Sequence, residues 1–222
     1  IQLDLSRLNS ISNFNQELGM VEIEPGVSQE MLYQHLQHSS WMIPTTGAGL
    51  EGSLVGNALD RGFGLNPISD HCSAIISMEV LLSDGSLLKS KLVEMGAHKS
   101  DAASKWKIGP YFEGLFSQSN LGVVLSVTLA LAPRPQAVDL VMIKAKRSQL
   151  PELIKVIHSL RRNYQDLIGA INFSSKERGQ ATFSSDSNQK PSYFQKILEK
   201  IFRVELADWQ AVVPLLTYDP HL

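Results

Sequence analysis

The chain has 222 residues, of which 43% are hydrophobic and 19% are charged, and its formal net charge at pH 7 is -2. This composition is typical of a globular protein with enough apolar material for a sizeable core. The balanced charge gives no bulk attraction to nucleic acid or to anionic lipid, so neither is expected as a partner. The single cysteine, Cys72, excludes a disulfide within the chain and a cysteine zinc site, and we assign no metal site. Apolar residues after Cys72 predict a buried structural thiol.

No apolar run approaches the roughly 20 residues that a membrane helix needs. No signal peptide is visible, and the chain begins at Ile1 without a methionine, so a missing signal says little about compartment. We expect a cytoplasmic protein that can form oligomers.

The first elements along the chain follow from alternation and capping. Residues 21–26 (VEIEPG) alternate apolar and acidic side chains and end on a Pro-Gly turn, which predicts a half-buried strand. Ser28 is suited to cap a helix that runs to about Gln37, with Glu30 in its first turn. Its predicted inner face consists of Met31, Leu32 and Leu36.

The stretch 47–71, GAGLEGSLVGNALDRGFGLNPISDH, is too rich in glycine for a regular element to be predicted. Glycines let backbone N–H groups approach a ligand closely, and several such groups form an anion-binding concavity. A flexible surface loop is the alternative, but the apolar residues among the glycines favour ligand contact. The stretch lacks the Lys-Ser/Thr of a phosphate-binding P-loop. GAGLEG has the spacing of a Rossmann fingerprint, but a poor strand precedes it, which argues against an NAD-binding module.

The rest of the chain divides into two groups of elements. Two apolar runs flank Asp84-Gly85, which predicts a hairpin, and residues 122–133 predict a strand that ends at a proline. After the APRPQ segment, residues 137–146 predict a strand and Ser148 is expected to cap a helix. The predicted helix carries Leu153, Ile154, Ile157 and Leu160 at helical spacing. A strand at 169–175, an exposed polar loop at 174–190 and an amphipathic helix at 193–202 complete the predicted elements.

Four segments together resemble one protein family. They read EPGVSQEMLYQHL, IPTTGAGLEGSLVGNALDRGFG, SDHCSAIISMEVLLSDGSLLKS and KIGPYFEGLFSQSNLGVVLSVTLALAPRPQ. Their order and spacing are similar to those of the flavin-binding domain of the vanillyl-alcohol oxidase and 4-cresol dehydrogenase family. The resemblance runs from the start of the chain to about Gln136, and the remainder is similar to the start of that family's substrate-binding cap.

The resemblance implies an α+β fold: an FAD-binding domain of the p-cresol methylhydroxylase type, with a mixed or antiparallel sheet and flanking helices. We expect this domain at 1–135 and part of a ferredoxin-like cap domain at 136–222. It also implies FAD as cofactor. The implied FAD-binding residues are Pro25, Gly26 and Val27 beside the adenine, Thr46, Gly47, Gly52, Ser53, Gly56 and Asn57 along the pyrophosphate and toward the ring, and the backbone of Gly122, Val123 and Val124.

The Asp-His pair at the end of the glycine stretch is similar in position to the family's active-site acid. Asp70 is therefore the candidate catalytic residue, assisting proton transfer near the reactive flavin nitrogen. The alternative is an aspartate that caps a turn. We expect His71 to support the site by hydrogen bonding, and Asp60 and Arg61 to form a local ion pair. Tyr111 and Phe112 are interpreted as packing aromatics.

The sequence also departs from the family. Leu65 and Ile68 stand where relatives acting on para-alkyl phenols carry tyrosines, which weakens the case for a phenolic substrate. The family's N-terminal pyrophosphate loop and most of its cap are expected beyond this sequence, as are the residues that tether flavin covalently.

The predicted function is an FAD-dependent oxidoreductase that moves hydride from an alcohol or alkyl-phenol-like C–H to flavin N5. A small-molecule substrate is the expected partner, with oxygen or a cytochrome as electron acceptor. Two alternatives stay open: a truncated, non-catalytic flavoprotein fragment, and a relative that oxidises 2-hydroxy acids.

Overall fold

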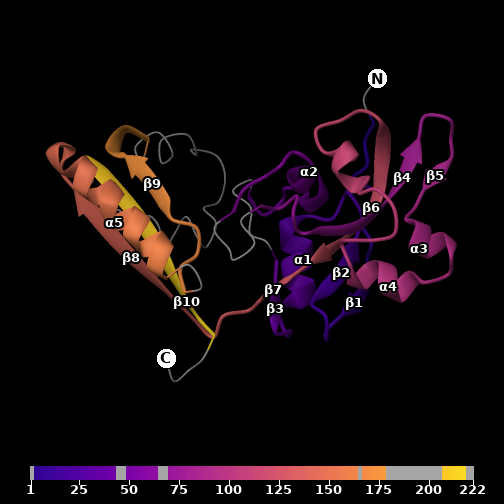
Figure 1. The fold of residues 1–222 in the computed structure, drawn as a ribbon, viewed down its shortest axis with the longest axis horizontal. Coiled ribbons are helices and arrows are strands. Elements are labelled where there is room, and N and C mark those ends of the chain that lie inside the picture. Colours follow the sequence, from indigo (N-terminus) through magenta and orange to yellow (C-terminus); the bar gives the residue numbers. More distant parts are fainter. Residues whose placement is uncertain (1–2, 44–48, 65–69, 165–166, 179–206, 219–222) are drawn as a thin grey trace. The chain divides into compact units, whose positions relative to one another are not determined.

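The computed structural model describes residues 3–43, 49–64, 70–164, 167–178 and 207–218. The chain divides into two compact units, Ile1–Arg134 and Pro135–Leu222 (Figure 1). Each unit has a hydrophobic core of its own. None of the helices in the described ranges is long and apolar enough to cross a membrane.

The first unit is organised around a five-stranded sheet with the order β1-β2-β6-β4-β5. Each of its strand pairs is antiparallel, as the prediction of a mixed or antiparallel sheet allows. The strands are β1 (Ile11–Asn15), β2 (Met20–Ile23), β4 (Ile75–Leu82), β5 (Leu87–Leu88) and β6 (Gly122–Ala130). A separate two-stranded sheet joins β3 (Trp41–Met42) to β7 (Ala132–Pro133).

Alternation along β2 sets which side chains enter the core. Val21 and Ile23 are completely buried, and both lie in the cluster that forms the core of the first unit. Glu22 lies between them on the opposite side of the strand, where its carboxylate accepts a hydrogen bond from Asn13 Nδ2 at 2.6 Å. The period of two in the sequence therefore predicted this strand correctly.

Two serines cap the helices that follow in the first unit. Helix α1 (Gln29–Leu36) begins after Ser28, whose Oγ accepts the Met31 N–H at 3.2 Å. Leu32 and Leu36 point into the core, so the predicted cap and inner face are both confirmed. Helix α2 (Leu54–Leu59) begins after Ser53 in the same way.

Helix α2 corrects the prediction that the glycine stretch holds no regular element. Leu54, Val55 and Ala58 are buried on one face of this short helix, and their contacts with the core outweigh the unfavourable Gly56 in its interior. The described part of the stretch thus contains a capped helix. Further short helices in this unit are α3 (Lys91–Glu94), α4 (His98–Ala103) and the 3₁₀ turn η1 (Glu113–Phe116).

The predicted hairpin is present between β4 and β5. Gly85 adopts a left-handed conformation with φ of 84°, and Asp84 Oδ1 accepts the Ser86 N–H at 2.9 Å. Leu81 pairs with Leu87 across the turn. A left-handed residue at this point is what made Asp-Gly a strong signal.

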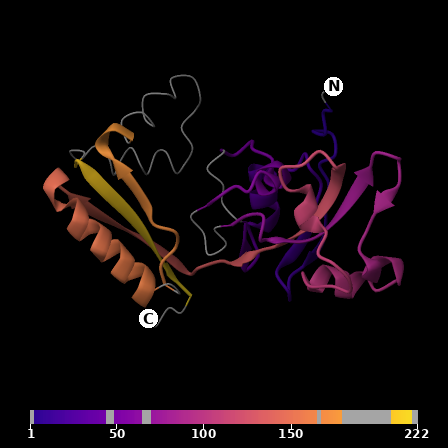
Figure 2. The ribbon, with the colours of Figure 1, turned by 45° about the horizontal axis from the view of Figure 1, so that its top comes forward.

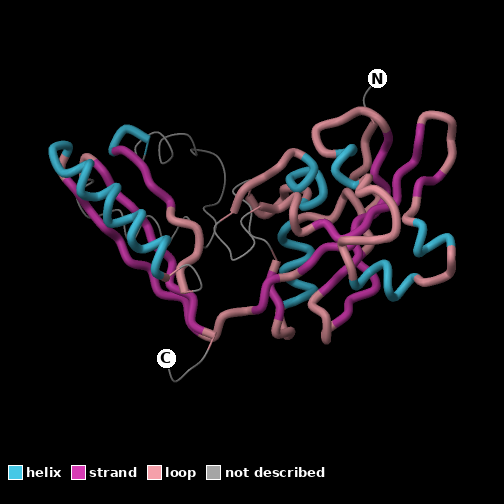
Figure 3. The backbone as a smooth tube through the Cα atoms, in the orientation of Figure 1, coloured by secondary structure: helices cyan, strands magenta, loops and turns pink. Residues whose placement is uncertain are grey.

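The second unit is a three-stranded antiparallel sheet with α5 (Leu150–Asn163) along one face (Figures 2 and 3). Strand β10 (Trp209–Thr217) is central, between β8 (Ala137–Ala145) and β9 (Asn172–Ser175). Leu153 of the helix is buried with Ala145 and Ala211, and the rings of Phe173 and Trp209 stack at 5.1 Å beside them.

Details at the start of α5 differ from the prediction. Ser148 does not cap the helix; it lies within the 3₁₀ turn η2 (Arg147–Gln149), and Gln149 Oε1 accepts the Lys146 N–H at 3.0 Å. Of the apolar residues predicted at helical spacing, Leu153 is buried, whereas Ile154 is 40% exposed. The helix predicted at 193–202 lies outside the described residues.

Candidate functional site

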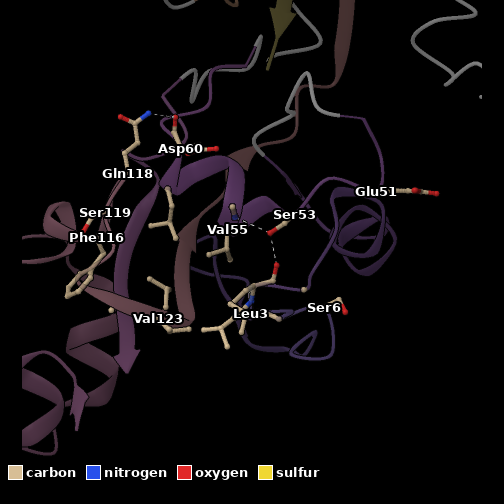
Figure 4. A pocket seen from close by; sticks show the side chains of 17 residues that line it. Leu3, Ser6, Glu51, Ser53, Val55, Asp60, Phe116, Gln118, Ser119 and Val123 are labelled. Atoms are coloured by element: carbon tan, nitrogen blue, oxygen red, sulfur yellow. Dashed lines mark hydrogen bonds between the residues drawn. The ribbon is translucent and has the colours of Figure 1, made fainter. Parts of the chain in front are cut away.

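A cavity of about 580 Å³ lies in the first unit where three segments meet: the turn at Pro25, the start of α2 and the start of β6 (Figure 4). Seven of the residues predicted to bind FAD line it: Pro25, Gly26, Ser53, Gly56, Gly122, Val123 and Val124. Its volume is typical of a small-molecule or cofactor site.

Sequence reasoning missed the other residues that line the cavity. They are Leu3, Leu5, Ser6, Glu51, Val55, Leu59, Asp60, Phe116, Gln118 and Ser119. Most of these side chains are apolar or uncharged, and Figure 4 shows Glu51 extending away from the others. Gln118 is held by its own backbone N–H bond to Leu59 O at 2.9 Å. Its place in the motif SQSNLG, just before β6, is the signal that could have found it.

Ser53 joins two walls of the cavity. Its Oγ accepts the Gly56 N–H at 3.0 Å, which caps α2, and donates to the carbonyl oxygen of Pro25 at 2.6 Å. Backbone bonds reinforce this junction, because Leu54 N–H donates to Val27 O at 3.2 Å. The Pro-Gly-Val turn and the Gly-Ser loop are therefore joined directly, although Pro25 and Ser53 are 28 positions apart in the sequence.

Two glycines at the cavity, Gly26 and Gly122, lie where a Cβ would clash with neighbouring parts of the protein. Gly26 donates its N–H to Leu8 O at 2.6 Å, and a Cβ there would clash with the backbone of Ser6. A Cβ on Gly122 would lie 2.6 Å from Val80 Cγ1. The Gly26 N–H is thus already used, as is that of Gly56, and neither is available to a phosphate. The part that these residues play in cofactor binding stays a prediction.

Three predicted cofactor residues within the described part of the chain do not line the cavity. Val27 is completely buried in the core. Gly52 uses its carbonyl to accept the Gln29 N–H at 3.0 Å. Asn57 faces His71, as set out next. Thr46 and Gly47 lie outside the described residues.

Asn57, Gly62 and His71 form a closed set of hydrogen bonds. His71 Nδ1 lies 2.5 Å from Asn57 Oδ1, Gly62 N–H donates to Asn57 O at 2.8 Å, and His71 N–H donates to Gly62 O at 3.1 Å. A Cβ at Gly62 would clash with the Asn57 side chain and would displace it from His71. This set explains why Gly-Asn, Arg-Gly and Asp-His occur together, and it connects α2 to the turn at Asp70.

Asp70 is exposed and begins the turn that precedes β4. Its Oδ1 accepts the Ser73 N–H at 3.2 Å, and its carbonyl accepts the Ser73 hydroxyl at 2.6 Å. The turn-capping role considered from sequence is therefore present. Asp70 is not among the described residues of the cavity wall, and its catalytic role stays a prediction.

The loop before η1 packs on the same turn. Lys105 Nζ donates to Ser73 O at 2.9 Å and lies 5.5 Å from the centre of the Tyr111 ring. Burial raises the pKa of the Tyr111 phenol, and the nearby Cys72 and Asp70 raise it further. Cys72 itself is only half-buried, which corrects the expectation of a buried thiol.

A buried ion cluster anchors this loop. Lys107 Nζ lies 2.8 Å from Asp101 Oδ1 and 3.2 Å from Glu113 Oε1, and all three side chains are at most 7% exposed. The Ser90 hydroxyl donates to Asp101 as well. By contrast, the ion pair expected between Asp60 and Arg61 is not formed. Arg61 Nε donates to Ser117 Oγ at 2.9 Å instead.

Comparison with known proteins places this site in context. Residues 1–91 match the family described as an FAD binding domain. A 1'-carboxy-chondrochloren decarboxylase of Chondromyces crocatus is 41% identical over 138 residues, 61% of this chain and 26% of that protein. The 4-cresol dehydrogenase [hydroxylating] flavoprotein subunit of Pseudomonas putida is 29% identical over 135 residues, 60% of this chain and 26% of the relative. The chain thus matches about a quarter of each relative's length.

Solved structures support the same fold. A crystal structure of p-cresol methylhydroxylase with substrate bound superposes with a TM-score of 0.79 at 23% identity, covering 97% of this chain and 43% of the other. At this identity the likeness establishes the fold alone. The antiparallel sheets and flanking helices are those of the α+β fold that the sequence predicted.

The cavity fits part of an FAD molecule. Its apolar wall, formed by Val55, Phe116 and Val123 among others, suits an uncharged ring or chain. No lysine or arginine lines it in the described part of the chain, so an anionic part of the cofactor here would depend on backbone N–H groups. The first unit carries an FAD-binding domain, and FAD is its cofactor. The chain is similar to flavoproteins of the 4-cresol dehydrogenase and p-cresol methylhydroxylase type, as the four sequence segments indicated.

Proposed function

We propose that the protein is part of an FAD-dependent oxidoreductase. Its substrate is an alcohol or an alkyl-phenol-like compound, and the enzyme removes hydride from a C–H bond of that substrate. Bound FAD supplies the hydride acceptor, its N5 atom. The observation that carries this proposal is the cavity built from the Pro25 turn, the Ser53 cap and the start of β6.

The residues of this chain divide the work. Ser53 keeps two cavity walls together through its bonds to Pro25 O and Gly56 N. The apolar side chains of Val55 and Val123 exclude water from the bound cofactor. Asp70 is the proposed acid–base residue: its free carboxylate oxygen accepts the proton that the substrate hydroxyl loses as hydride leaves the carbon.

Of the two relatives, the one named as a dehydrogenase supports this class of reaction, and neither name selects a substrate for this chain. The names of the two relatives are those of a decarboxylase and a dehydrogenase. We keep the alcohol or alkyl-phenol class as the proposal and 2-hydroxy acids as the alternative. Oxygen or a cytochrome is the proposed electron acceptor.

Flavin titration and anaerobic reduction test the proposal. FAD is added to the purified chain, and quenching of flavin fluorescence measures binding. A 4-alkylphenol, an aryl alcohol and a 2-hydroxy acid are then supplied without oxygen, and loss of the long-wavelength flavin absorption measures reduction. We expect binding, reduction by one of the first two compounds, and slower reduction in Asp70→Asn. Absence of FAD binding contradicts the cofactor site of this chain, and reduction by the hydroxy acid alone selects the alternative.

A further inference from the structure

His71 is buried, although it directly follows the exposed Asp70 in the chain. Its side chain is 3% exposed, and only one of its two ring nitrogens has a hydrogen-bond partner among the described residues. Nδ1 faces Asn57 Oδ1, whereas Nε2 is buried without a partner. Such an asymmetric environment selects one protonation form of an imidazole ring.

The partners determine which form that is. With the hydrogen on Nδ1, the ring donates to Asn57 Oδ1 and leaves a bare acceptor at Nε2. With the hydrogen on Nε2, the bare Nδ1 would face the Asn57 oxygen, which is also an acceptor, and the buried Nε2–H would find no acceptor among the described residues. The neutral Nδ1–H tautomer is therefore the stable one. Burial also lowers the pKa of His71, which keeps the ring neutral.

The bond from His71 connects two parts of the candidate site. Asn57 lies on α2, the helix whose first residues form the cavity wall. His71 lies next to Asp70 in the turn that Ser73 stabilises. Displacement of the His71 ring therefore moves the cavity wall and the Asp70 turn relative to each other.

We propose that His71, as the Nδ1–H tautomer bonded to Asn57, is a positioning residue that holds the Asp70 turn in register with the cofactor cavity. The importance of Asp70 in this statement rests on the proposed function, but the tautomer and the coupling do not. The ring acts on the site through Asn57 and not by contact with cofactor or substrate.

Two substitutions separate this role from simple packing. The amide nitrogen of asparagine lies close to the position of imidazole Nδ1, so His71→Asn keeps the donor to Asn57. The amide nitrogen of glutamine lies close to the position of Nε2, so His71→Gln fills similar space but places its donor where no described residue accepts it. Asn57→Ala removes the acceptor itself.

The first measurement needs no cofactor. Two-bond ¹⁵N–¹H correlations of the labelled chain report the tautomer of each histidine, and the signal that disappears in His71→Asn belongs to His71. We expect a neutral Nδ1–H ring. We also expect the Ser73 amide resonance, which reports the bond to Asp70 Oδ1, to shift in His71→Gln and Asn57→Ala and to stay in place in His71→Asn.

The second measurement is FAD affinity by fluorescence quenching. We expect His71→Asn to stay within about threefold of wild type and His71→Gln to bind about tenfold more weakly. The double variant His71→Gln/Asn57→Ala is expected to bind FAD no more weakly than the weaker-binding of the two single variants. Both substitutions break the same hydrogen bond, so their effects should not add.

A neutral Nε2–H ring in the wild-type spectrum overturns the proposal even if every variant fails to fold. Additive losses of FAD affinity in His71→Gln and Asn57→Ala also overturn it, as do equal losses of FAD affinity in His71→Asn and His71→Gln. If the wild-type chain binds no FAD, the proposed function fails, but the tautomer and the Ser73 shift still decide the role of His71.

Discussion

Replacement of Ser53 by alanine tests whether the junction between two cavity walls matters for the cofactor. The Ser53 hydroxyl makes two bonds, the cap to Gly56 N–H and the bond to Pro25 O. Loss of a helix N-cap costs about 1 kcal/mol, and loss of a further hydrogen bond costs about 1 kcal/mol. We expect Ser53→Ala to lower the free energy of unfolding by about 2 kcal/mol.

Ser28→Ala is the matched control. Ser28 caps α1 through the same kind of bond, to Met31 N–H, and its backbone bridges to that of Ser53. Ser28 is not one of the described residues that line the cavity, and its side chain makes no bond to Pro25. The expected loss of unfolding free energy is therefore about 1 kcal/mol, the cap alone.

Urea unfolding followed by circular dichroism measures both variants, and flavin fluorescence measures FAD affinity. Ser53→Ala is expected to bind FAD about fivefold more weakly, which corresponds to the roughly 1 kcal/mol of the bond between the walls. Ser28→Ala is expected to bind FAD as wild type does. Equal losses of affinity in the two variants, or equal losses of stability, refute the argument that Ser53 couples the Pro25 turn to α2.

Three further predictions concern packing and pH. Gly122→Ala places a methyl group against Val80 and is expected to lower the free energy of unfolding by about 1–3 kcal/mol; an unchanged urea midpoint contradicts this. Because burial lowers the pKa of His71, partly opposed by Asp70, the unfolded chain binds a proton that the folded chain does not. Stability contributed by the neutral ring is present above about pH 6.5 and is lost as the pH falls through the lowered value, so the melting temperature should fall less in His71→Asn between pH 7.5 and 5. In the second unit, Leu153→Ala empties the buried centre of the α5 interface and is expected to cost about 2–5 kcal/mol by thermal unfolding, whereas the exposed Ile154→Ala should cost less than half as much.

Local signals in the sequence predicted the elements that local physics controls. Ser28 was recognised as a cap because a serine side chain satisfies an amide of the first helical turn wherever a helix begins. Asp84-Gly85 was recognised as a turn because the left-handed conformation at the second position favours glycine. Both signals can be read from neighbouring residues alone, although the core stabilises the elements that they begin.

Other elements depend on contacts that are distant in the sequence, and for these the local residue preferences gave wrong predictions. Helix α2 contains Gly56 and was not predicted, yet the burial of Leu54, Val55 and Ala58 against the core stabilises it. Ser148 had the right residue type for a cap, but Gln149 folds back onto Lys146 N–H and the α-helix starts later.

The candidate site, too, has residues that the sequence indicated and residues whose place depends on contacts distant in the sequence. The family resemblance named seven residues of the cavity wall, but periodicity alone could not place Leu3 and Leu5 there, because the N-terminal segment reaches the cavity only through the folded turn at Gly26. Nor could it reveal that Asn57 bonds to His71 across 14 positions of the chain.

The position of β6 in its sheet has a consequence for synthesis on the ribosome. It lies between β2 and β4, and its register joins Ile23 to Val127 and Met20 to Ala130. About a hundred residues are synthesised between β2 and β6. Until β6 has emerged, the edges of β2 and β4 that pair with it are exposed in the nascent chain. Shortened products that end before Ala130 should therefore aggregate or require a chaperone, whereas those that end just after Arg134 can complete the sheet.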